Sequence, residues 1–213
     1  MAARIATDER DALLIVDMQN DFMPGGALPV EDGDSIVPLV NRLSRQFVNV
    51  VLTQDWHPPG HISFASSHDG AAPFGSIAAP YGDQALWPDH CVQGSAGAEL
   101  HAGLACDRAT LILRKGRHGD IDSYSAFLEA DRKTLTGLAG FLREKGVGRV
   151  FACGLATDFC VAHSALDARA MGFETFVIDD ACRAIDANDS LDLAWARMDA
   201  AQVVRIQSRE LLP

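Results

Sequence analysis

Three side chains with complementary chemistry follow apolar runs that lie far apart in the sequence: Asp17, Lys115 and Cys160. A thiolate can attack a carbonyl carbon, a carboxylate can take the proton of the thiol, and an ammonium group can stabilise the thiolate. If the three side chains meet, they suit nucleophilic acyl transfer. Each also has an ordinary alternative, namely a capping Asp, a surface Lys and a structural Cys, since free cysteines are often buried.

Cys160 occupies a position that favours a reactive thiol. It follows the apolar run 150–153 and precedes a predicted helix over residues 162–170. Thr157 and Asp158 are residue types that commonly cap a helix N-terminus. The positive end of a helix dipole biases a thiol towards thiolate, and the backbone N–H groups there could bind an oxyanion. We therefore expect Cys160 to be an activated nucleophile at the start of a helix.

A second group of residues could hold a metal ion. Asp55 and His57 are two residues apart, so in an extended segment their side chains point to the same side and can share one ion. His61 follows closely, and His90 lies later in the same Gly- and Pro-rich segment. A lone Asp or His in a loop is usually polar surface. This combination instead favours a partly open His/carboxylate site, which zinc, iron or manganese could occupy.

The elements that must position these residues are predicted from hydrophobic patterning. Continuous apolar runs indicate strands buried on both faces, as in a parallel sheet, and helical spacing indicates covering helices. The predicted strands cover residues 12–16, 47–54, 110–113, 150–153, 173–178 and 202–206, and the predicted helices cover 36–43, 135–142, 162–170 and 190–201. We expect an α/β fold: a single three-layer, doubly wound domain over residues 1–213, with a mostly parallel sheet of about six strands flanked by helices.

This fold would bring the chemistry together. In open α/β sheets, ligands bind outside the carboxyl ends of the strands. The acidic, basic and thiol side chains named above all follow predicted strands, so we expect them to converge on one edge of the sheet. The segment 56–107 shows little periodicity. A segment of that length without regular structure normally carries function in a compact domain.

Composition restricts the partners and the compartment. The 213 residues carry a formal net charge of −11, which argues against nucleic acids and anionic membranes as partners, because both would be repelled. No apolar run approaches the roughly 20 residues needed to span a bilayer. Five cysteines without a Cys-x-x-Cys pair suit a reducing compartment, and the polar N-terminus has no signal-type apolar segment. We expect a cytoplasmic protein.

Taken as a series, the motifs resemble those of one family. They are Asp17-Met18-Gln19-Asn20-Asp21-Phe22, Asp55-Trp56-His57, Trp87-Pro88-Asp89-His90-Cys91-Val92, Lys115-Gly116 with Tyr124-Ser125-Ala126-Phe127, and Gly154-Leu155-Ala156-Thr157-Asp158-Phe159-Cys160-Val161. In this order, from about residue 11 to 206, they look like the motifs of nicotinamidases, also called pyrazinamidases, among the isochorismatase-like cysteine hydrolases. The first and last motifs are shared across that superfamily, whereas the Asp-x-His and Trp-Pro-x-His set selects nicotinamidases.

The resemblance implies a role for each matching residue. Cys160 would be the nucleophile, Asp17 the base that activates it, and Lys115 the third member of a catalytic triad. The backbone N–H groups of Ala156 and Cys160 would form an oxyanion hole, beside a cis peptide between Leu155 and Ala156. The substrate ring would lie in an aromatic, mostly apolar pocket, which suits a flat heteroaromatic ring. The residues implied for its wall are Phe22, Leu28, Trp87 and Tyr124.

The resemblance also implies a cofactor and a reaction. Asp55, His57 and His90 would hold one divalent metal ion that binds the pyridine nitrogen of the substrate, with His61 as a candidate fourth ligand. Zinc is the first choice, with iron and manganese as alternatives. The implied reaction is hydrolysis of nicotinamide, and also of pyrazinamide, through a Cys thioester. Nicotinamide would give nicotinate and ammonia, a step of NAD salvage.

Two alternatives stay open at this point. Another hydrolase of the superfamily would keep the triad and act on a different small amide or on an enol ether, without requiring the metal set. A non-catalytic protein that binds a small molecule on the same fold is the second alternative, and the three intact triad residue types argue against it. The sequence leaves the metal and the oligomeric state open, and a homo-oligomer is compatible with it.

Overall fold

A six-stranded sheet lies at the centre of the computed structural model, which describes residues 4–212 of the chain. The strand order is β5-β2-β1-β6-β7-β8, and every pair of neighbouring strands in this sheet is parallel. The strands are β1 (Asp11–Val16), β2 (Asn49–Asp55), β5 (Leu111–Lys115), β6 (Arg149–Leu155), β7 (Glu174–Arg183) and β8 (Val204–Ile206). The predicted α/β fold class, with about six mostly parallel strands, is confirmed.

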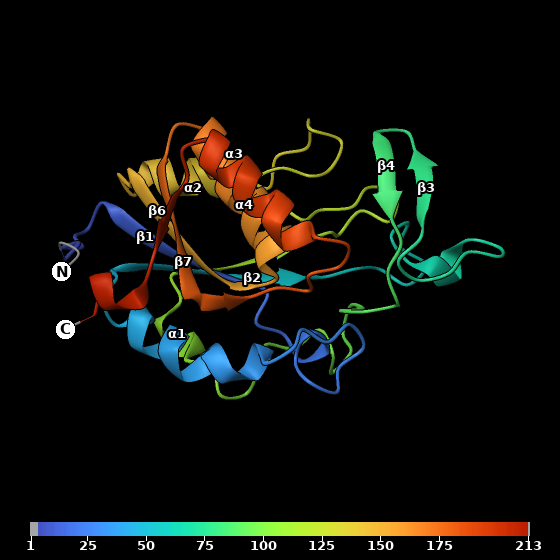
Figure 1. Cartoon of the computed structure of the whole chain (residues 1–213), viewed down its shortest axis with the longest axis horizontal. Coiled ribbons are helices and arrows are strands. Elements are labelled where there is room, and N and C mark those ends of the chain that lie inside the picture. Colours follow the sequence, from blue (N-terminus) through green and yellow to red (C-terminus); the bar gives the residue numbers. More distant parts are fainter. Residues whose placement is uncertain (1–3, 213) are drawn as a thin grey trace.

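Helices cover both faces of this sheet (Figure 1). One helix, α1 (Val37–Ser44), lies on one face, whereas α2 (Leu138–Glu144), α3 (Ala162–Ala170) and α4 (Ser190–Ala200) lie on the other. Short 3₁₀ turns occur at Asn20–Phe22, Gly33–Ile36, Ala65–Ser67, Cys106–Arg108 and Ser208–Glu210, and a π-helical turn, Thr157–Val161, precedes α3. The chain therefore forms the three-layer, doubly wound arrangement expected from alternating strands and helices.

The two central strands, β1 and β6, mark the point where the winding reverses. The chain passes from β1 to β2 and β5 on one side, and from β6 to β7 and β8 on the other. Ligands bind in the crevice outside the carboxyl ends of the strands at such a switch point. Gly154 allows the two strands to approach closely here, because its φ is +114° and a Cβ would overlap the carbonyl oxygen of Val16.

The irregular segment between β2 and β5 contains a hairpin that the sequence pattern did not reveal. The strands β3 (Ser76–Ala79) and β4 (Gly82–Ala85) pair antiparallel and project beyond the end of the main sheet (Figure 1). Apart from Ile77, their residues are small or polar, and most are at least partly accessible to solvent. They therefore lack the alternation of apolar and polar residues that predicts a half-buried strand.

The helix predicted over residues 135–142 begins later, at Leu138. Leu135, the first residue of the predicted helix, is 66% exposed, and its backbone forms an isolated β-bridge with Leu128. Gly137, with a φ of +95°, precedes the first helical residue, whose N–H group donates to the Thr136 hydroxyl at 3.2 Å. Leu135 keeps the spacing of a helical face although it lies outside the helix.

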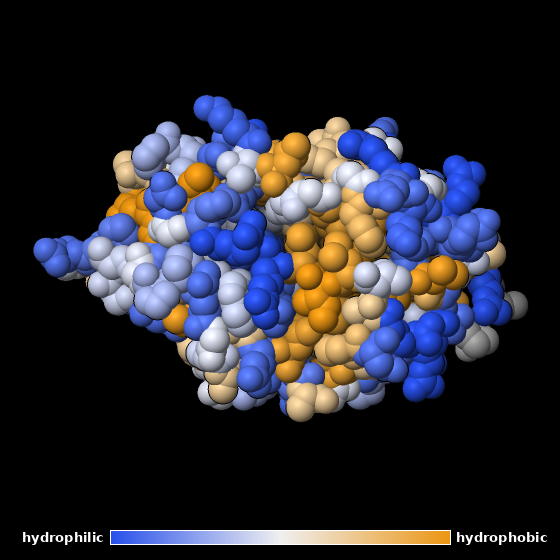
Figure 2. All heavy atoms as spheres, turned by 180° about the vertical axis from the view of Figure 1, so that it is seen from behind, coloured by the Kyte–Doolittle hydropathy of each residue, from blue (hydrophilic) through white to orange (hydrophobic). Residues whose placement is uncertain are grey.

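Apolar side chains also gather on the surface. Figure 2 shows a band of hydrophobic residues on the face opposite to that of Figure 1, with hydrophilic residues on either side. Surface patches of this kind often mark association sites. A homo-oligomer stays a prediction. Within residues 4–212, no helix has both the length and the apolar character needed to cross a membrane.

Candidate active site and metal centre

Lys115 lies at the centre of one buried group of side chains. Its Nζ atom is 2.9 Å from Asp17 Oδ2 and donates a hydrogen bond to Cys160 Sγ at 3.3 Å. It also donates to the carbonyl oxygen of Ser123 at 2.9 Å. Asp17 directly follows β1, Lys115 ends β5, and Cys160 lies in the turn that follows β6. None of the three side chains is more than 6% exposed. The structure thus brings together the carboxylate, the ammonium and the thiol that follow distant apolar runs.

Thr53 on β2 fixes the carboxylate of Asp17. Its hydroxyl donates to Asp17 Oδ1 at 2.6 Å and accepts from the Asp17 backbone N–H at 3.1 Å. The other oxygen, Oδ2, forms an ion pair with Lys115 but has no directed hydrogen bond. Within residues 4–212, it is the one buried side-chain N or O atom without a hydrogen-bond partner. A carboxylate oxygen of Asp17 lies within 4.8 Å of Cys160 Sγ. Asp17 Oδ2 is therefore available to accept a proton.

Burial and charge set the protonation states of this group. Burial raises the pKa of Asp17, and Lys115 offsets this only in part. Burial lowers the pKa of Lys115, but Asp17 and Asp55 outweigh it and hold that pKa well above its usual value. Burial also raises the pKa of the Cys160 thiol well above its usual value, with Lys115 opposing. The expected bias of Cys160 towards thiolate is therefore wrong for the resting protein, because desolvation outweighs the attraction of the ammonium.

Cys160 lies in the π-helical turn that leads into α3. The expected side-chain cap from Thr157 or Asp158 is wrong, because the structure shows no side-chain cap at this end and Ala156 occupies the capping position. The Asp158 carboxylate instead accepts from the backbone N–H groups of Ile185 and Asp186, at 3.1 and 2.8 Å, and from the Ser190 hydroxyl. It therefore ties the turn to the connection between β7 and α4. The peptide between Leu155 and Ala156 is cis, as the resemblance implied.

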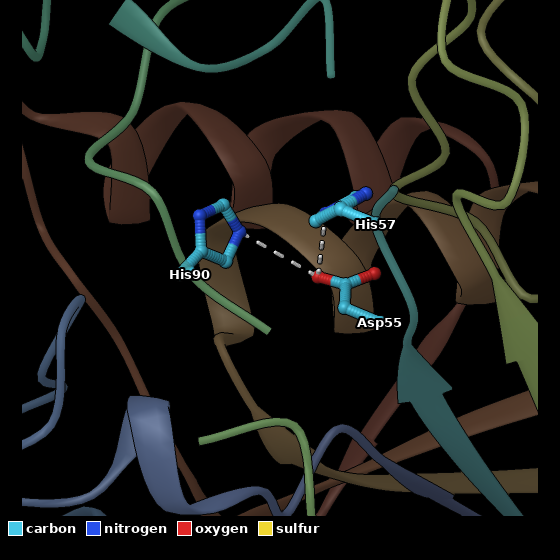
Figure 3. A group of neighbouring side chains, drawn as sticks. All are labelled: Asp55, His57 and His90. Atoms are coloured by element: carbon cyan, nitrogen blue, oxygen red, sulfur yellow. Dashed lines mark ion pairs between the residues drawn. The ribbon is translucent and has the colours of Figure 1, made fainter. Parts of the chain in front are cut away.

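Figure 3 shows a second buried group, formed by Asp55, His57 and His90. The Nε2 atoms of His57 and His90 lie 3.7 and 3.9 Å from Asp55 Oδ2, and both rings point towards this oxygen. Asp55 ends β2, and its other oxygen, Oδ1, accepts from Lys115 Nζ at 2.5 Å. Asp55 is therefore shared between the two groups.

The donor atoms of this second group suit a divalent metal ion. One ligand atom from each of Asp55, His57 and His90 lies within 4.8 Å of the others. Nδ1 of His57 contacts the carbonyl oxygen of Gly116 at 3.0 Å, and Nδ1 of His90 contacts that of Pro88 at 2.8 Å. Because a carbonyl oxygen can only accept, both Nδ1 atoms carry the proton and both Nε2 atoms face the carboxylate. Metal-binding histidines are commonly oriented in this way.

The pKa directions agree with ligation. Burial raises the pKa of Asp55, but Lys115, His57 and His90 outweigh it and keep this carboxylate ionised. Burial and the neighbouring His57 lower the pKa of His90 to about 4, so its ring is neutral, which is the form that binds metals. Burial lowers the pKa of His57, yet Asp55 raises it by more, so a metal ion would displace a proton from this ring.

His61 lies beside the metal ligands, but its nitrogens have other partners. Nδ1 is 2.7 Å from the Ser63 hydroxyl, Nε2 is 3.2 Å from the carbonyl oxygen of Ile121, and the ring packs on His57 with centroids 4.2 Å apart. With His57 and Asp122 it forms a separate group of ligand-type atoms within 4.8 Å. A role for His61 as a fourth ligand stays a prediction.

A narrow apolar pocket lies between the two groups. Cys160 and Ala156 line one part of it, and Asp55, His57 and His90 line another. All four residues expected in the ring pocket also line it: Phe22, Leu28, Trp87 and Tyr124. The Trp87 indole N–H donates to the Tyr124 hydroxyl at 2.9 Å, which fixes two of these aromatic rings relative to each other.

Three further residues line this pocket and were missed in the sequence: Phe159, Ile185 and Asp122. Phe159 packs edge-on against Trp87, with ring centroids 4.9 Å apart. Its position directly before Cys160 was a usable signal. Asp122 lies two residues before Tyr124, which begins the Tyr-Ser-Ala-Phe motif, and it stands outside that motif. Ile185 follows β7 and gives no local signal, because the contact that holds it there comes from Asp158.

Comparisons with known proteins agree with this fold and site. The model of the isochorismatase domain matches residues 11–210, and the chain belongs to the isochorismatase family. A nicotinamidase from Acinetobacter baylyi is 57% identical over 201 residues, which cover 94% of this chain and 94% of that protein. The sequence resemblance to nicotinamidases is thereby confirmed.

Solved structures extend the comparison. A nicotinamidase and pyrazinamidase from Acinetobacter baumanii superposes with a TM-score of 0.95 at 56% identity, covering 96% of this chain and 99% of that one. PnC1 from L. infantum in complex with nicotinate superposes with a TM-score of 0.86 at 40% identity, and the match covers 98% of each chain. The pyrazinamidase of Pyrococcus horikoshii in complex with zinc superposes with a TM-score of 0.75 at 39% identity, and the match covers 93% of this chain and 99% of that one.

Proposed function

We propose that this protein is a nicotinamidase that hydrolyses nicotinamide to nicotinate and ammonia, and also accepts pyrazinamide, as a step of NAD salvage in the cytoplasm. The observation that carries the proposal is one apolar pocket with a Lys115-bridged acid–thiol pair on one side and a His/carboxylate metal set on the other. An apolar pocket between a thiol and a His/carboxylate set suits a flat ring that carries a carboxamide. The curated nicotinamidase relative and the nicotinate complex of a homologue support the same substrate.

In the first half of the reaction, Cys160 attacks the carboxamide carbon. Asp17 Oδ2, which has no directed hydrogen bond, takes the thiol proton as the S–C bond forms. The Lys115 ammonium, 3.3 Å from Sγ, stabilises the negative charge on sulfur during the transfer. The backbone N–H groups of Ala156 and Cys160 bind the oxyanion. The C–N bond then breaks, the nitrogen receives the proton from Asp17, and ammonia leaves a thioester on Cys160.

In the second half, water attacks the thioester carbon and gives a proton to Asp17. The C–S bond breaks, Cys160 regains the proton from Asp17, and nicotinate is released. Lys115 keeps its charge throughout, because Asp17 and Asp55 hold its pKa well above its usual value. The thiol is therefore the resting form in each cycle, in agreement with its raised pKa.

Asp55, His57 and His90 would hold one divalent metal ion, which we propose to be zinc, with iron and manganese as the alternatives. When bound, the ion supplies a Lewis acid that takes the pyridine nitrogen of the substrate and orients the ring. Phe22, Leu28, Trp87 and Tyr124 exclude water around the ring. The zinc complex of a homologous pyrazinamidase supports the choice of metal.

The test is an ammonia-release assay with nicotinamide and with pyrazinamide, before and after treatment with a chelator. We expect release from both amides, loss of release after chelation, and recovery on adding back zinc. Elemental analysis of the purified protein identifies the ion. Absence of ammonia release from metal-loaded protein would sink the proposed substrate, and full activity in metal-free protein would sink the metal role.

A further inference from the structure

Asp122 is a buried carboxylate that forms no ion pair with a Lys or Arg side chain in the part of the chain that the structure describes. The residue is 3% exposed. Its Oδ2 accepts from the Gln84 side-chain amide at 2.7 Å, and its Oδ1 accepts from the backbone N–H of Ser123 at 2.7 Å. Both oxygens accept hydrogen bonds from neutral donors, and neither oxygen donates one. A buried charge without a counter-ion is costly, so a cation is expected nearby.

The position of Asp122 indicates where that cation lies. One of its oxygens is within 4.8 Å of ring nitrogens of His57 and His61, and the residue lines the same pocket as Asp55 and His90. Lys115 forms no ion pair with Asp122, because its ammonium contacts Asp17, Asp55 and Cys160 instead. The carboxylate therefore stands at the edge of the proposed metal centre.

The sum of the charges at the site also favours a role for Asp122 beside the metal ion. Lys115 carries one positive charge, and Asp17 and Asp55 carry one negative charge each when ionised. A divalent ion added to these three would leave a surplus of one positive charge, which the negative charge of Asp122 cancels. A bound ion is often the largest charge in its site, so the carboxylates around it must be counted together.

The β3–β4 hairpin holds Asp122 in place. Gln84 on β4 is 2% exposed, and its amide donates to Asp122 while its side-chain oxygen accepts from the Tyr81 hydroxyl at 2.9 Å. The Tyr81 hydroxyl also accepts from the backbone N–H of Asp122 at 3.3 Å. The hairpin projects beyond the main sheet (Figure 1). Through Gln84 and Tyr81 it contacts one carboxylate at the metal side of the pocket.

We propose that Asp122 supplies the charge that balances the metal ion from outside its ligand set, and that Gln84 positions this carboxylate. The inference rests on the metal centre proposed at Asp55, His57 and His90. It adds a positioning role for the hairpin.

Metal affinity tests the inference. Zinc binding is measured by competition with a chelating dye for the wild-type protein, Asp122→Asn and Gln84→Ala, with Asp120→Asn and Asp83→Asn as exposed controls of the same charge change. Outer partners of metal ligands typically contribute about 10–100-fold to affinity. We expect a loss in that range for Asp122→Asn, a smaller loss for Gln84→Ala, and less than about twofold for the controls. Wild-type affinity in Asp122→Asn, or an equal loss in Asp120→Asn, would overturn the proposal.

Thermal unfolding separates this role from a merely structural one. Asp122→Asn removes the negative charge that faces the bound ion, so the gain in melting temperature on adding zinc should shrink by more than the melting temperature of the metal-free protein changes. A lower melting temperature of the metal-free variant with an unchanged gain would refute the charge-balancing role. Should Asp122→Asn not fold, Gln84→Ala decides the matter by the same two measurements. Wild-type protein that binds no metal at all would count against the proposed metal centre itself.

Discussion

The two halves of the site differ in how their charges are balanced. In the half formed by Asp17, Lys115 and Cys160, the protein supplies the positive charge, because the Lys115 ammonium faces the Asp17 carboxylate and the Cys160 thiol. The half formed by Asp55, His57 and His90 instead brings one carboxylate oxygen and two imidazole nitrogens within 4.8 Å of one another. The first half is arranged for proton transfer, and the second is arranged to receive an ion from outside. Damage to one half should therefore be separable from damage to the other.

The largest expected effect is on the first half. Cys160→Ala removes the nucleophile and should lower turnover by about 10⁴-fold or more, as removal of a nucleophile does in other hydrolases. Zinc content should stay at the wild-type level, because Cys160 is not among the three donors. Ammonia release and elemental analysis measure the two quantities. Cys106→Ala, which changes a partly exposed cysteine outside the pocket, is the control. Retained turnover in Cys160→Ala would remove the basis for a thioester.

The next effect belongs to the second half. His57→Asn removes a metal ligand and should weaken zinc binding by more than the about 100-fold that bounds the effect of an outer partner. Alkylation of Cys160 in the metal-free state should continue, because the contacts of Lys115 with Asp17 and Cys160 do not involve His57. Equilibrium dialysis and mass spectrometry report the two outcomes. His118→Asn is the matched control, since that imidazole is exposed. Unchanged zinc affinity in His57→Asn would contradict the ligand assignment.

Acid should affect the first half through Asp17. Its carboxylate must be deprotonated to take the thiol proton, and burial raises its pKa above the ordinary value of 3.8. Activity is therefore present above the raised pKa and is lost as the pH falls through it. A profile of kcat/KM against pH, recorded with saturating zinc, measures this acidic limb. A profile that stays flat down to pH 3.8 would show that Asp17 is not the base.

Thr53 should give a smaller effect within the first half. Thr53→Val removes both hydrogen bonds to Asp17 and should lower kcat by about tenfold, corresponding to the about 1–2 kcal/mol that such bonds contribute. KM and zinc content should change little, because the substitution leaves the pocket wall and the donor atoms in place. Thr53→Ser keeps the hydroxyl and should restore most of kcat. Equal losses in the serine and valine variants would assign Thr53 to packing alone.

The smallest effect is expected outside both halves. Leu135→Ala should change the free energy of unfolding by no more than about 0.5 kcal/mol, because the side chain is exposed. Leu138→Ala, at a buried position three residues later, should cost about 2–5 kcal/mol. Urea unfolding of the two variants measures the difference. A similar cost at both positions would restore the longer helix that the sequence pattern predicts.

The two halves also differ in how well the sequence predicts their structure. β1 and β6 are buried on both faces, so they appear as continuous apolar runs, and the positions of Asp17 and Cys160 follow from the strand ends. The metal half lies in an irregular segment, where residue types indicate ligands but not orientation. The Gln84–Asp122 bond joins residues 38 apart across an exposed hairpin, and no periodic pattern records such a contact. Asp158 shows the same limit, because its partners are set by tertiary contacts rather than by helix capping.

Lys115 joins the two halves, and its place in the sheet has a consequence for local motion. It ends β5, an outer strand of the main sheet that pairs with β2 alone, and its direct neighbour in the register is Asp55. Strand ends at the margin of a sheet open with a lower free energy than the whole domain unfolds. Fraying of this one margin would withdraw the ammonium from Asp17, Asp55 and Cys160 together. On heating, catalysis should then be lost when β5 opens, before the buried centre of the sheet melts. The hydrogen exchange of the β5 amides measures this opening.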